Sequence, residues 1–272
     1  MKRKYGTGAL ESKKKATDFI YKPDKANWKG GTRYNAKDIE DQSKVGICTA
    51  ITVTQQARKA RGIKYSADFQ YLLQKKYVDK NWDEGSSTAH GPYVAYKYGL
   101  LPEKDWKWTK QADRKLPYSK YIKKLQAVPD KEIARLLKIA EKHKVIGYQR
   151  IVPLTRDTLA NAIDESEAGV VTRMECGATW WTNPIEPLRY PKPIFSGHAL
   201  TASNYTGNSV RVANTWGDDW ADKGTAYYMF KDNAPTEAYI VYYNEKTKLL
   251  EKQIKAKDGI WFKVKKFISK LQ

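Results

Sequence analysis

The spacing of the hydrophobic residues changes from a helical to a strand-like period part-way along the chain. Apolar residues recur three and four positions apart up to about residue 144, and short β-branched and aromatic runs dominate after it. This change predicts an α+β protein of two parts, one helical and one mainly β, with a boundary between residues 107 and 128. The predicted helices are 48–62, 66–76, 129–144 and 155–163, and the predicted strands are 145–151, 169–174, 199–204, 209–213 and 226–230.

Cys48 is one of two cysteines in the chain, and it opens a predicted helix directly after a glycine-containing loop. The free N–H groups and the dipole at a helix start favour the thiolate form of a cysteine. A cysteine in a helical pattern is nevertheless more often a small buried hydrophobe, so its position alone does not make Cys48 a nucleophile. Cys176 has no such setting and is expected to be a buried or strand-end thiol. Two cysteines cannot build the disulfide framework of a small secreted protein, which favours a reducing compartment.

Three further residues supply the groups that a cysteine nucleophile requires. Gln42 lies six residues before Cys48, and its side-chain amide is suited to stabilising an oxyanion. His198, within a Gly-His-Ala sequence, supplies a base, and Asn214, which begins an Asn-Thr-Trp-Gly sequence, supplies an amide that can orient this base. Each of these residues taken singly is a common strand or turn residue, so the prediction rests on their combination.

The identity and spacing of these residues resemble the papain family of cysteine peptidases. In that family the glutamine precedes the cysteine by six positions and the asparagine follows the histidine by sixteen, as Gln42, Cys48, His198 and Asn214 do here. The Gly-Ile-Cys-Thr-Ala sequence around Cys48 and a Gly-Ser-Ser loop followed by residues 98–106 are similar to the bacterial, disulfide-poor branch of the family. The resemblance covers roughly residues 28–245.

The resemblance implies a papain-like two-subdomain fold, with a helical left subdomain, a β-barrel-like right subdomain and the active-site cleft between them. The catalytic domain is then expected over residues 28–244, helical over about 40–110 and mainly β over about 128–244. Residues 1–27 form a basic N-terminal arm in this interpretation. Residues 245–272, in which apolar residues recur at helical spacing among lysines, form a basic amphipathic C-terminal helix.

By the same resemblance, Cys48 is the nucleophilic thiolate and His198 is its imidazolium partner, which later protonates the leaving amine. Asn214 orients His198, and Trp216 shields the hydrogen bond between them from water. The Gln42 amide and the backbone N–H of Cys48 form an oxyanion hole, in which one donor is typically worth about 3 kcal/mol.

The resemblance also places Gly85, Ser86 and Ser87 along the extended backbone of a bound substrate, with Trp216 completing the substrate-binding set. His90 and His143 have no partners at metal-ligand spacing, so no metal site is predicted. The sequence has neither a Walker-type loop nor a dinucleotide fingerprint, so no cofactor is expected.

The chain departs from the family at several positions, two of which bear on its location. Val45 and Ser86 stand where many relatives have a pair of disulfide-forming cysteines, which again fits a reducing compartment. Only 47 residues precede Cys48, fewer than an inhibitory proregion of the family's kind, so the resemblance implies a form without a proregion. Restraint of activity would then come from location, partners or specificity. The basic residues 1–4 are not followed by the apolar segment of a signal peptide, so the expected location is the cytoplasm or a virion.

The net charge of +20 is concentrated at the two ends of the chain. Residues 1–27 and 245–272 together contribute 11 of these charges, so the middle is mildly basic. The charge either solubilises the protein or binds a partner, which would be a protein assembly or an anionic surface. Nucleic acid is a possible partner without a motif to support it, and no apolar run reaches the roughly 18 residues that span a membrane. The C-terminal helix is expected to dock on its own domain, on a partner protein or on an anionic membrane.

The leading prediction is a cysteine endopeptidase, a hydrolase that cleaves protein or peptide substrates through a Cys-His-Asn triad and a thioester acyl-enzyme. One alternative is a papain-like structural or packaged component of a larger assembly such as a virion, whose basic arms bind neighbours or nucleic acid. Another is a peptidoglycan peptide hydrolase. The Asn-Thr-Trp-Gly sequence favours the peptidase over the cell-wall enzymes.

Overall fold

The computed structural model describes residues 6–12, 20–21, 30–177, 179–182, 187–188, 194 and 196–244. Its helices are α1 (Cys48–Arg61), α2 (Ala67–Leu73), α3 (His90–Lys97), α4 (Tyr118–Gln126), α5 (Asp130–Ala140), α6 (Arg156–Glu165) and α7 (Thr179–Thr182), with a π-helix η2 (Gln74–Asp79) and 3₁₀ turns η1 (Ala36–Asp38), η3 (Glu103–Asp105), η4 (Gln111–Lys115) and η5 (Glu141–His143). Its strands are β1 (Ala9–Leu10), β2 (Ile20–Tyr21), β3 (Ser86–Ser87), β4 (Gly147–Ile151), β5 (Val170–Cys176), β6 (Ser196–Thr206), β7 (Ser209–Ala213), β8 (Thr225–Met229) and β9 (Glu237–Tyr242). The predicted C-terminal helix lies outside the described residues.

The helices form where the sequence carries both an apolar face and a defined end. Helix α1 begins at Cys48 and ends before Gly62, which takes the left-handed conformation with φ of +70°, as glycine does at many helix ends. Ser66 caps α2 because its side chain accepts a hydrogen bond from the Phe69 N–H. After Leu73 the α-helix continues as the wider π-helix η2, so the helical stretch predicted over 66–76 extends to Asp79.

Seven strands form one sheet in the order β2-β4-β9-β5-β6-β7-β8. All neighbouring pairs are antiparallel except β2 and β4. Strands β2 and β8 are the edges among the described residues, so pairing between these strands does not close the sheet into a barrel. The five predicted strands are all present. Strand β9, which the sequence analysis did not predict, lies between β4 and β5 and is buried along its whole length.

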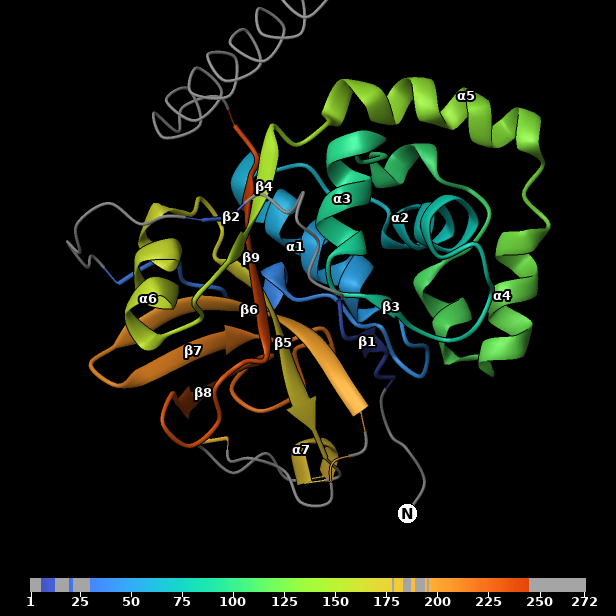
Figure 1. The fold of residues 1–272 in the computed structure, drawn as a ribbon. Helices are drawn as coiled ribbons and strands as arrows, with labels where there is room; N and C mark the ends of the chain where they lie inside the picture. Colours follow the sequence, from blue (N-terminus) through green and yellow to red (C-terminus); the bar gives the residue numbers. More distant parts are fainter. Residues whose placement is uncertain are drawn as a thin grey trace, which may run out of the picture.

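The helical and β parts each have their own core, and a third cluster joins them. Helices α2 to α5 lie on one side of Figure 1, the sheet and α6 lie on the other, and α1 lies between them. The helical core includes Ile133 and Leu136 of α5, so the helical part extends to Ala140 and not only to about residue 110 as the sequence suggested. The joining cluster packs Val53 of α1 with residues of β5 and β9. In the described part of the chain, no helix is long and apolar enough to cross a membrane.

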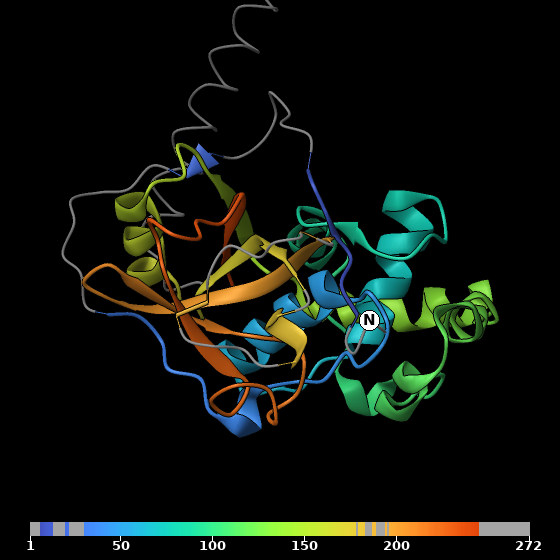
Figure 2. The same ribbon diagram turned by 90° about the horizontal axis from the view of Figure 1, so that it is seen from below.

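Residues 6–12 do not extend from the molecule as part of an arm. This segment, the strap, runs between the β part and the helical part, as the dark blue trace in Figure 2 shows. Its strand β1 pairs in parallel with β3 of the helical part and also packs against β6 of the sheet. The strap therefore lies between the two parts, where the sequence placed the active-site cleft.

Candidate active site

Cys48 and His198 come from the two different parts of the molecule. Cys48 is the first residue of α1, and His198 is the third residue of β6, the strand against which α1 packs. Both side chains are fully buried in this structure, and Cys48 packs in one small cluster with Ala199, the neighbour of His198. The packing of α1 on β6 thus brings the thiol of Cys48 and the ring of His198 to the same interface.

The imidazole of His198 is fixed by a hydrogen bond to Asn214 and by stacking against Trp216. Its Nε2 lies 2.6 Å from Oδ1 of Asn214, an oxygen that only accepts, so Nε2 is the donor. The same oxygen accepts the backbone N–H of Thr215 at 2.8 Å, which fixes the orientation of the Asn214 amide. The indole of Trp216 stacks on the imidazole with ring centroids 4.4 Å apart. This arrangement leaves Nδ1 as the ring nitrogen for proton transfer.

Gln42 is the fourth predicted catalytic residue, and its side chain is fully buried at the same place. Its Nε2 donates to the carbonyl oxygens of Val45 and Gly6, at 2.9 and 2.7 Å. Its Oε1 accepts from the hydroxyl of Thr215 at 2.5 Å, so Thr215 decides which end of the amide faces the site. One N–H group of Gln42 thus points at the carbonyl oxygen of Gly6, as an oxyanion-hole donor points at the carbonyl oxygen of a substrate.

A buried arginine fixes the loop that carries Gln42. Arg114 donates from Nη1 to Glu40 Oε1 at 2.7 Å and to the Asp41 carbonyl at 3.0 Å, and from Nε to Asp68 Oδ1 at 2.9 Å. Burial raises the pKa of Glu40 despite the opposing effect of Arg114. Burial alone would lower the pKa of Arg114, but the Asp68 and Glu40 carboxylates outweigh it and raise that pKa. The guanidinium thus stays charged and ties residues 40–41 to α2.

Three of the four predicted substrate-binding residues, Gly85, Ser86 and Ser87, lie in β3 or directly before it and contact the strap, and the fourth, Trp216, contacts the strap from the sheet side. The Ser86 N–H donates to the Gly8 carbonyl at 2.8 Å, and the hydroxyls of Ser87 and Ser12 lie 2.7 Å apart. Gly85 has φ of +92°, a conformation that glycine adopts without strain. The backbone of β3 is therefore paired with an extended peptide segment, and this segment belongs to the chain itself.

The strap lies against the residues that the sequence predicts to be catalytic. The Gly6 carbonyl accepts hydrogen bonds from Nε2 of Gln42 and from Nε1 of Trp216, at 2.7 and 2.9 Å. Ala9 packs in the cluster that contains Cys48 and Ala199. Residues 6–12 therefore cover the side chains that are predicted to be catalytic.

Two glycines allow the strap to fit so closely. A Cβ atom on Gly8 would lie 2.7 Å from Cα of Gly85 and 2.8 Å from the carbonyl oxygen of Gly46. A Cβ atom on Gly6 would lie 2.0 Å from the carbonyl oxygen of Val45. These distances are to backbone atoms, which cannot rotate away, so neither position accepts a larger residue with the strap in place.

Charged side chains hold the end of the strap that is remote from Gln42. Arg173 donates from Nε to the Ala9 carbonyl at 3.0 Å, and Glu237 accepts the backbone N–H of Ser12 at 2.7 Å. Arg150 lies 3.8 Å from Glu237 and 3.4 Å from the Ser12 carbonyl. The sequence analysis missed these contacts, as well as the role of Thr215. Thr215 stood within the Asn-Thr-Trp-Gly sequence, which was a usable signal, whereas nothing in the sequence distinguished Arg173 or Glu237.

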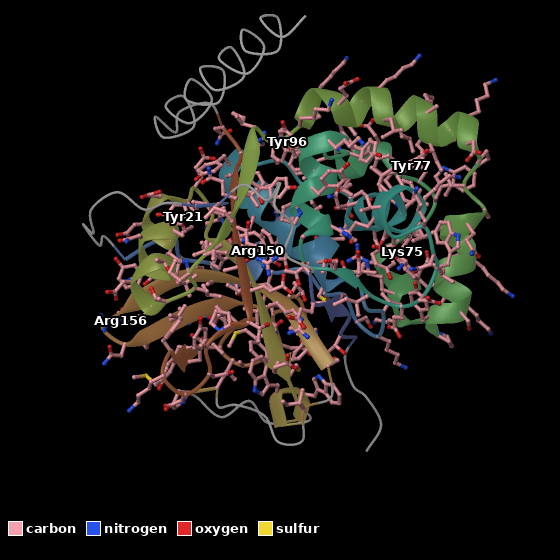
Figure 3. All side chains as sticks on the ribbon, in the orientation of Figure 1. Tyr21, Lys75, Tyr77, Tyr96, Arg150 and Arg156 are labelled. Atoms are coloured by element: carbon pink, nitrogen blue, oxygen red, sulfur yellow. The ribbon has the colours of Figure 1, made fainter. Side chains whose placement is uncertain are left out.

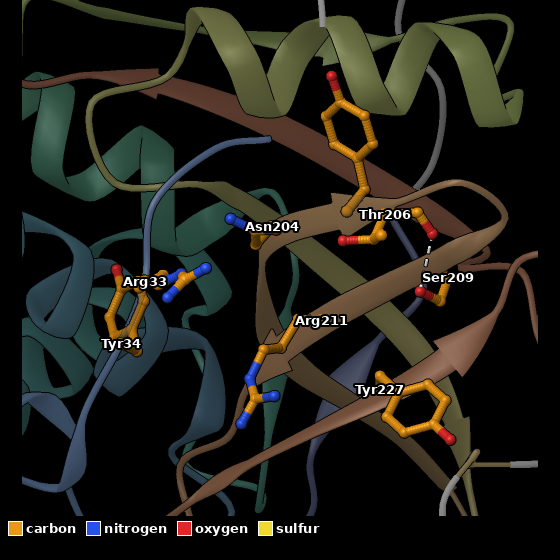
Figure 4. A pocket seen from close by; sticks show the side chains of 8 residues that line it. Arg33, Tyr34, Asn204, Thr206, Ser209, Arg211 and Tyr227 are labelled. Carbon is orange, nitrogen blue, oxygen red and sulfur yellow. Dashed lines mark hydrogen bonds between the residues drawn. The ribbon is translucent and has the colours of Figure 1, made fainter. Parts of the chain in front are cut away.

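Cys176 and the nearby Trp180 and Trp181 pack in the core of the β part, in the same cluster as Trp216. In the described ranges, no group of three or more His, Cys, Asp or Glu side chains is placed to hold a metal ion. Figure 4 shows a separate cavity of about 500 Å³ over β6 and β7. This cavity contains none of the predicted catalytic residues. Its lining residues are Arg33, Tyr34, Asn204, Tyr205, Thr206, Ser209, Arg211 and Tyr227.

No protein-family model and no curated protein matches this sequence, but solved structures do. Xylellain, a cysteine protease from Xylella fastidiosa, superposes with a TM-score of 0.71 at 20% identity, over 90% of this chain and 99% of that one. Procathepsin B S9 from Trypanosoma congolense gives a TM-score of 0.62 at 14% identity, covering 88% of this chain and 87% of that one. Digestive procathepsin L 3 from Tenebrio molitor larval midgut gives a TM-score of 0.58 at 13% identity, covering 88% of this chain and 76% of that one.

These likenesses identify the fold. The chain has the two-part α+β architecture of papain-like cysteine proteases, which confirms the predicted fold class. At 13–20% identity, the comparison shows a shared fold alone.

Proposed function

We propose that this chain is a cysteine peptidase that hydrolyses peptide bonds in protein or peptide substrates. One observation carries the proposal: His198 is clamped between Asn214 and Trp216 on the strand against which the helix opened by Cys48 packs. A thiol at a helix start and an oriented imidazole from a facing strand form the nucleophile and base of acyl transfer. The fold shared with cysteine proteases supports the same chemistry.

The chemistry follows from the positions of the groups. The Cys48 thiolate attacks the carbonyl carbon of the peptide bond, and the electron pair of the C=O bond moves to oxygen. The amide of Gln42, aimed by Thr215, donates to this oxygen together with the backbone N–H of Cys48. When the tetrahedral species collapses, the C–N bond breaks, His198 gives its proton to the leaving amine, and a thioester to Cys48 remains. His198 then takes a proton from water, the resulting hydroxide attacks the thioester, and the C–S bond breaks.

We further propose that the strap restrains this activity. The Gly6 carbonyl takes up the N–H of Gln42 that the oxyanion needs, and Gly8 pairs with the strand expected to bind substrate. A substrate must therefore displace residues 6–12 before it can reach Cys48.

The experiment compares hydrolysis of fluorogenic peptides and casein by the full-length chain and its variants. In Gly8→Val, the new side chain meets the backbone of Gly85 and Gly46, so the strap is expelled. Overpacking of this kind typically costs about 1–3 kcal/mol, which corresponds to a rise in kcat/KM of about fivefold to more than a hundredfold. Cys48→Ala in either background is expected to show no hydrolysis.

Leu10→Ala is the matched control within the strap, because the Leu10 side chain is 53% exposed and its removal leaves the fit intact. Its activity should equal that of the wild type. If a folded Gly8→Val chain hydrolyses none of these substrates, the peptidase proposal is wrong. Hydrolysis of cell-wall peptides in place of casein would favour the peptidoglycan hydrolase, and a folded but inactive Gly8→Val chain would leave the structural component as the better account.

A further inference from the structure

A buried lysine forms an ion pair with an aspartate beneath β3. Lys75 and Asp79 belong to the π-helix η2, and the side chain of Lys75 is 1% exposed. Its Nζ lies 2.8 Å from Asp79 Oδ2, 3.0 Å from Asn81 Oδ1 and 2.8 Å from the Gly85 carbonyl oxygen. An ammonium group has three N–H donors, and each has an acceptor here. Figure 3 labels Lys75 within the helical part.

Asp79, the acidic member of the pair, contacts Ser86, the residue that follows Gly85. Asp79 Oδ1 accepts from the Ser86 hydroxyl at 3.2 Å and lies 2.5 Å from Nδ1 of His90. Burial alone would raise the pKa of Asp79, but the hydrogen bonds from His90 and Lys75 outweigh it and lower that pKa. The pair therefore holds two successive residues, Gly85 through its carbonyl and Ser86 through its hydroxyl.

Stability alone does not account for a buried ion pair. Removing a lysine and an aspartate from water costs several kcal/mol per ion, and well-packed apolar side chains often serve a fold equally well. The contact that distinguishes Lys75 is the one to the Gly85 carbonyl, which lies beside the strap.

The planarity of the peptide bond links this contact to the substrate position. The Gly85 carbonyl and the Ser86 N–H belong to one peptide unit, in which they point in opposite directions. Because Lys75 draws the carbonyl into the helical part, the Ser86 N–H must point outward, where it meets the Gly8 carbonyl at 2.8 Å. Tyr71 reinforces this orientation, because its hydroxyl donates to the same Gly85 carbonyl oxygen at 3.3 Å.

We propose that Lys75 is a positioning residue for peptide recognition: held by Asp79, it aims the Ser86 N–H at a main-chain carbonyl of whichever extended peptide lies along β3. That peptide is the strap in this structure and, resting on the proposed function, a substrate when the strap is displaced. Lys75 touches neither Cys48 nor the oxyanion donor, so it acts on peptide binding and not on the chemical step.

The test introduces Lys75→Met into two full-length backgrounds. In the Gly8→Val background, KM for a peptide substrate should rise about tenfold, because one hydrogen bond to the substrate is lost. The value of kcat and the rate of Cys48 alkylation by iodoacetamide should stay within about twofold of those of the Gly8→Val parent. In the wild-type background the same substitution should speed alkylation of Cys48, because the strap loses the same hydrogen bond. The second arm requires no catalysis, so it tests Lys75 even if the peptidase proposal fails.

Lys76→Met is the matched control, because the neighbouring Lys76 pairs with Asp130 at the surface and should change neither quantity. If Lys75→Met does not fold, Asp79→Asn keeps the shape, removes the charge that orients Lys75, and should produce smaller changes in the same directions. The proposal is overturned if Lys75→Met lowers the thermal midpoint but changes neither KM nor alkylation. A parallel fall of kcat and of alkylation in the Gly8→Val background would also overturn it, since it would indicate general damage to the site.

Discussion

At the scale of the residue, Asn214 is the point on which the imidazole geometry depends. Its Oδ1 accepts from both His198 Nε2 and the Thr215 N–H, so the ring is tied through one atom to the backbone of the following residue. Trp216, which covers the ring, comes from the same short segment. A single turn of chain thus orients the imidazole, covers its face and, through the Thr215 hydroxyl, orients the Gln42 amide.

Asn214→Ala removes the acceptor of the His198 hydrogen bond without removing the base itself. In the Gly8→Val background we expect kcat to fall about a hundredfold, because a misoriented imidazole loses much of the usual benefit of acid–base catalysis, while KM changes little. Steady-state kinetics measure both. Asn204→Ala, at a partly buried asparagine over the separate cavity, is the control and should retain the parent rates. Equal kcat values for Asn214→Ala and its parent would show that Asn214 does not orient the base.

The four residues predicted to be catalytic lie close together in the structure. The prediction used their identities and spacing, which can be interpreted without any knowledge of packing. Lys75 and Gly6 could not be predicted in this way. Lys75 contacts Gly85, 10 positions away, and Gly6 contacts Gln42, 36 positions away. Neither residue belongs to a sequence pattern that would indicate such a contact. Their roles follow from burial and from steric fit, which only the folded chain defines.

At the scale of the element, the π-helix η2 connects the helical core to the strand that carries the predicted substrate-binding residues. It places Lys75 and Asp79 four residues apart on one side, where both reach the residues before and within β3. Wider helical turns of this kind are frequent at functional sites. The two-residue strand β3 is too short to keep its own geometry, so its shape depends on η2.

Comparing the wild type with Asp79→Asn should show how much the ionised Asp79 carboxylate contributes to the free energy of unfolding at each pH. Because the folded pKa of Asp79 lies below its ordinary value of 3.8, its ionised form stabilises the fold above that pH, and this contribution is lost as the pH falls through the lowered pKa. The wild type should therefore exceed Asp79→Asn in unfolding free energy most at pH 5, and the gap should narrow towards pH 3. Urea unfolding at several pH values measures this gap, and the exposed Asp232→Asn is the control. A gap that stays constant with pH would contradict the lowered pKa.

The sequence predicted helices α1, α2, α5 and α6 because each combines an apolar face with a recognisable end, such as Gly62 after α1 or Thr155 before α6. It did not predict β9, because Glu237–Tyr242 is buried on both faces and so lacks the alternation that marks a strand. Strands β1 and β3 have two residues each and exist only through their pairing with one another. Pairing over such a distance in sequence has no local signal.

At the scale of the whole molecule, the strap connects the two parts whose interface forms the site. On one side it pairs with β3 of the helical part, and on the other it meets Arg173 and Glu237 of the sheet. Glu11 is the only charged residue among residues 6–12, although the surrounding 27-residue arm is strongly basic. The strap is thus held through hydrogen bonds to its main chain and through close steric fit, and not through basic side chains of its own. What the basic termini bind stays a prediction, with a protein assembly or an anionic surface as the candidates.

We propose that Cys48 is a reactive thiol which the strap covers. The most direct measurement is the rate of iodoacetamide modification of each thiol, followed by mass spectrometry on the full-length wild type and on Gly8→Val. Cys176, buried in the core of the β part, is the internal reference. We predict that Cys48 in Gly8→Val reacts at least about tenfold faster than Cys176 and faster than Cys48 in the wild type. Equal, slow modification of both cysteines in Gly8→Val would contradict the claim.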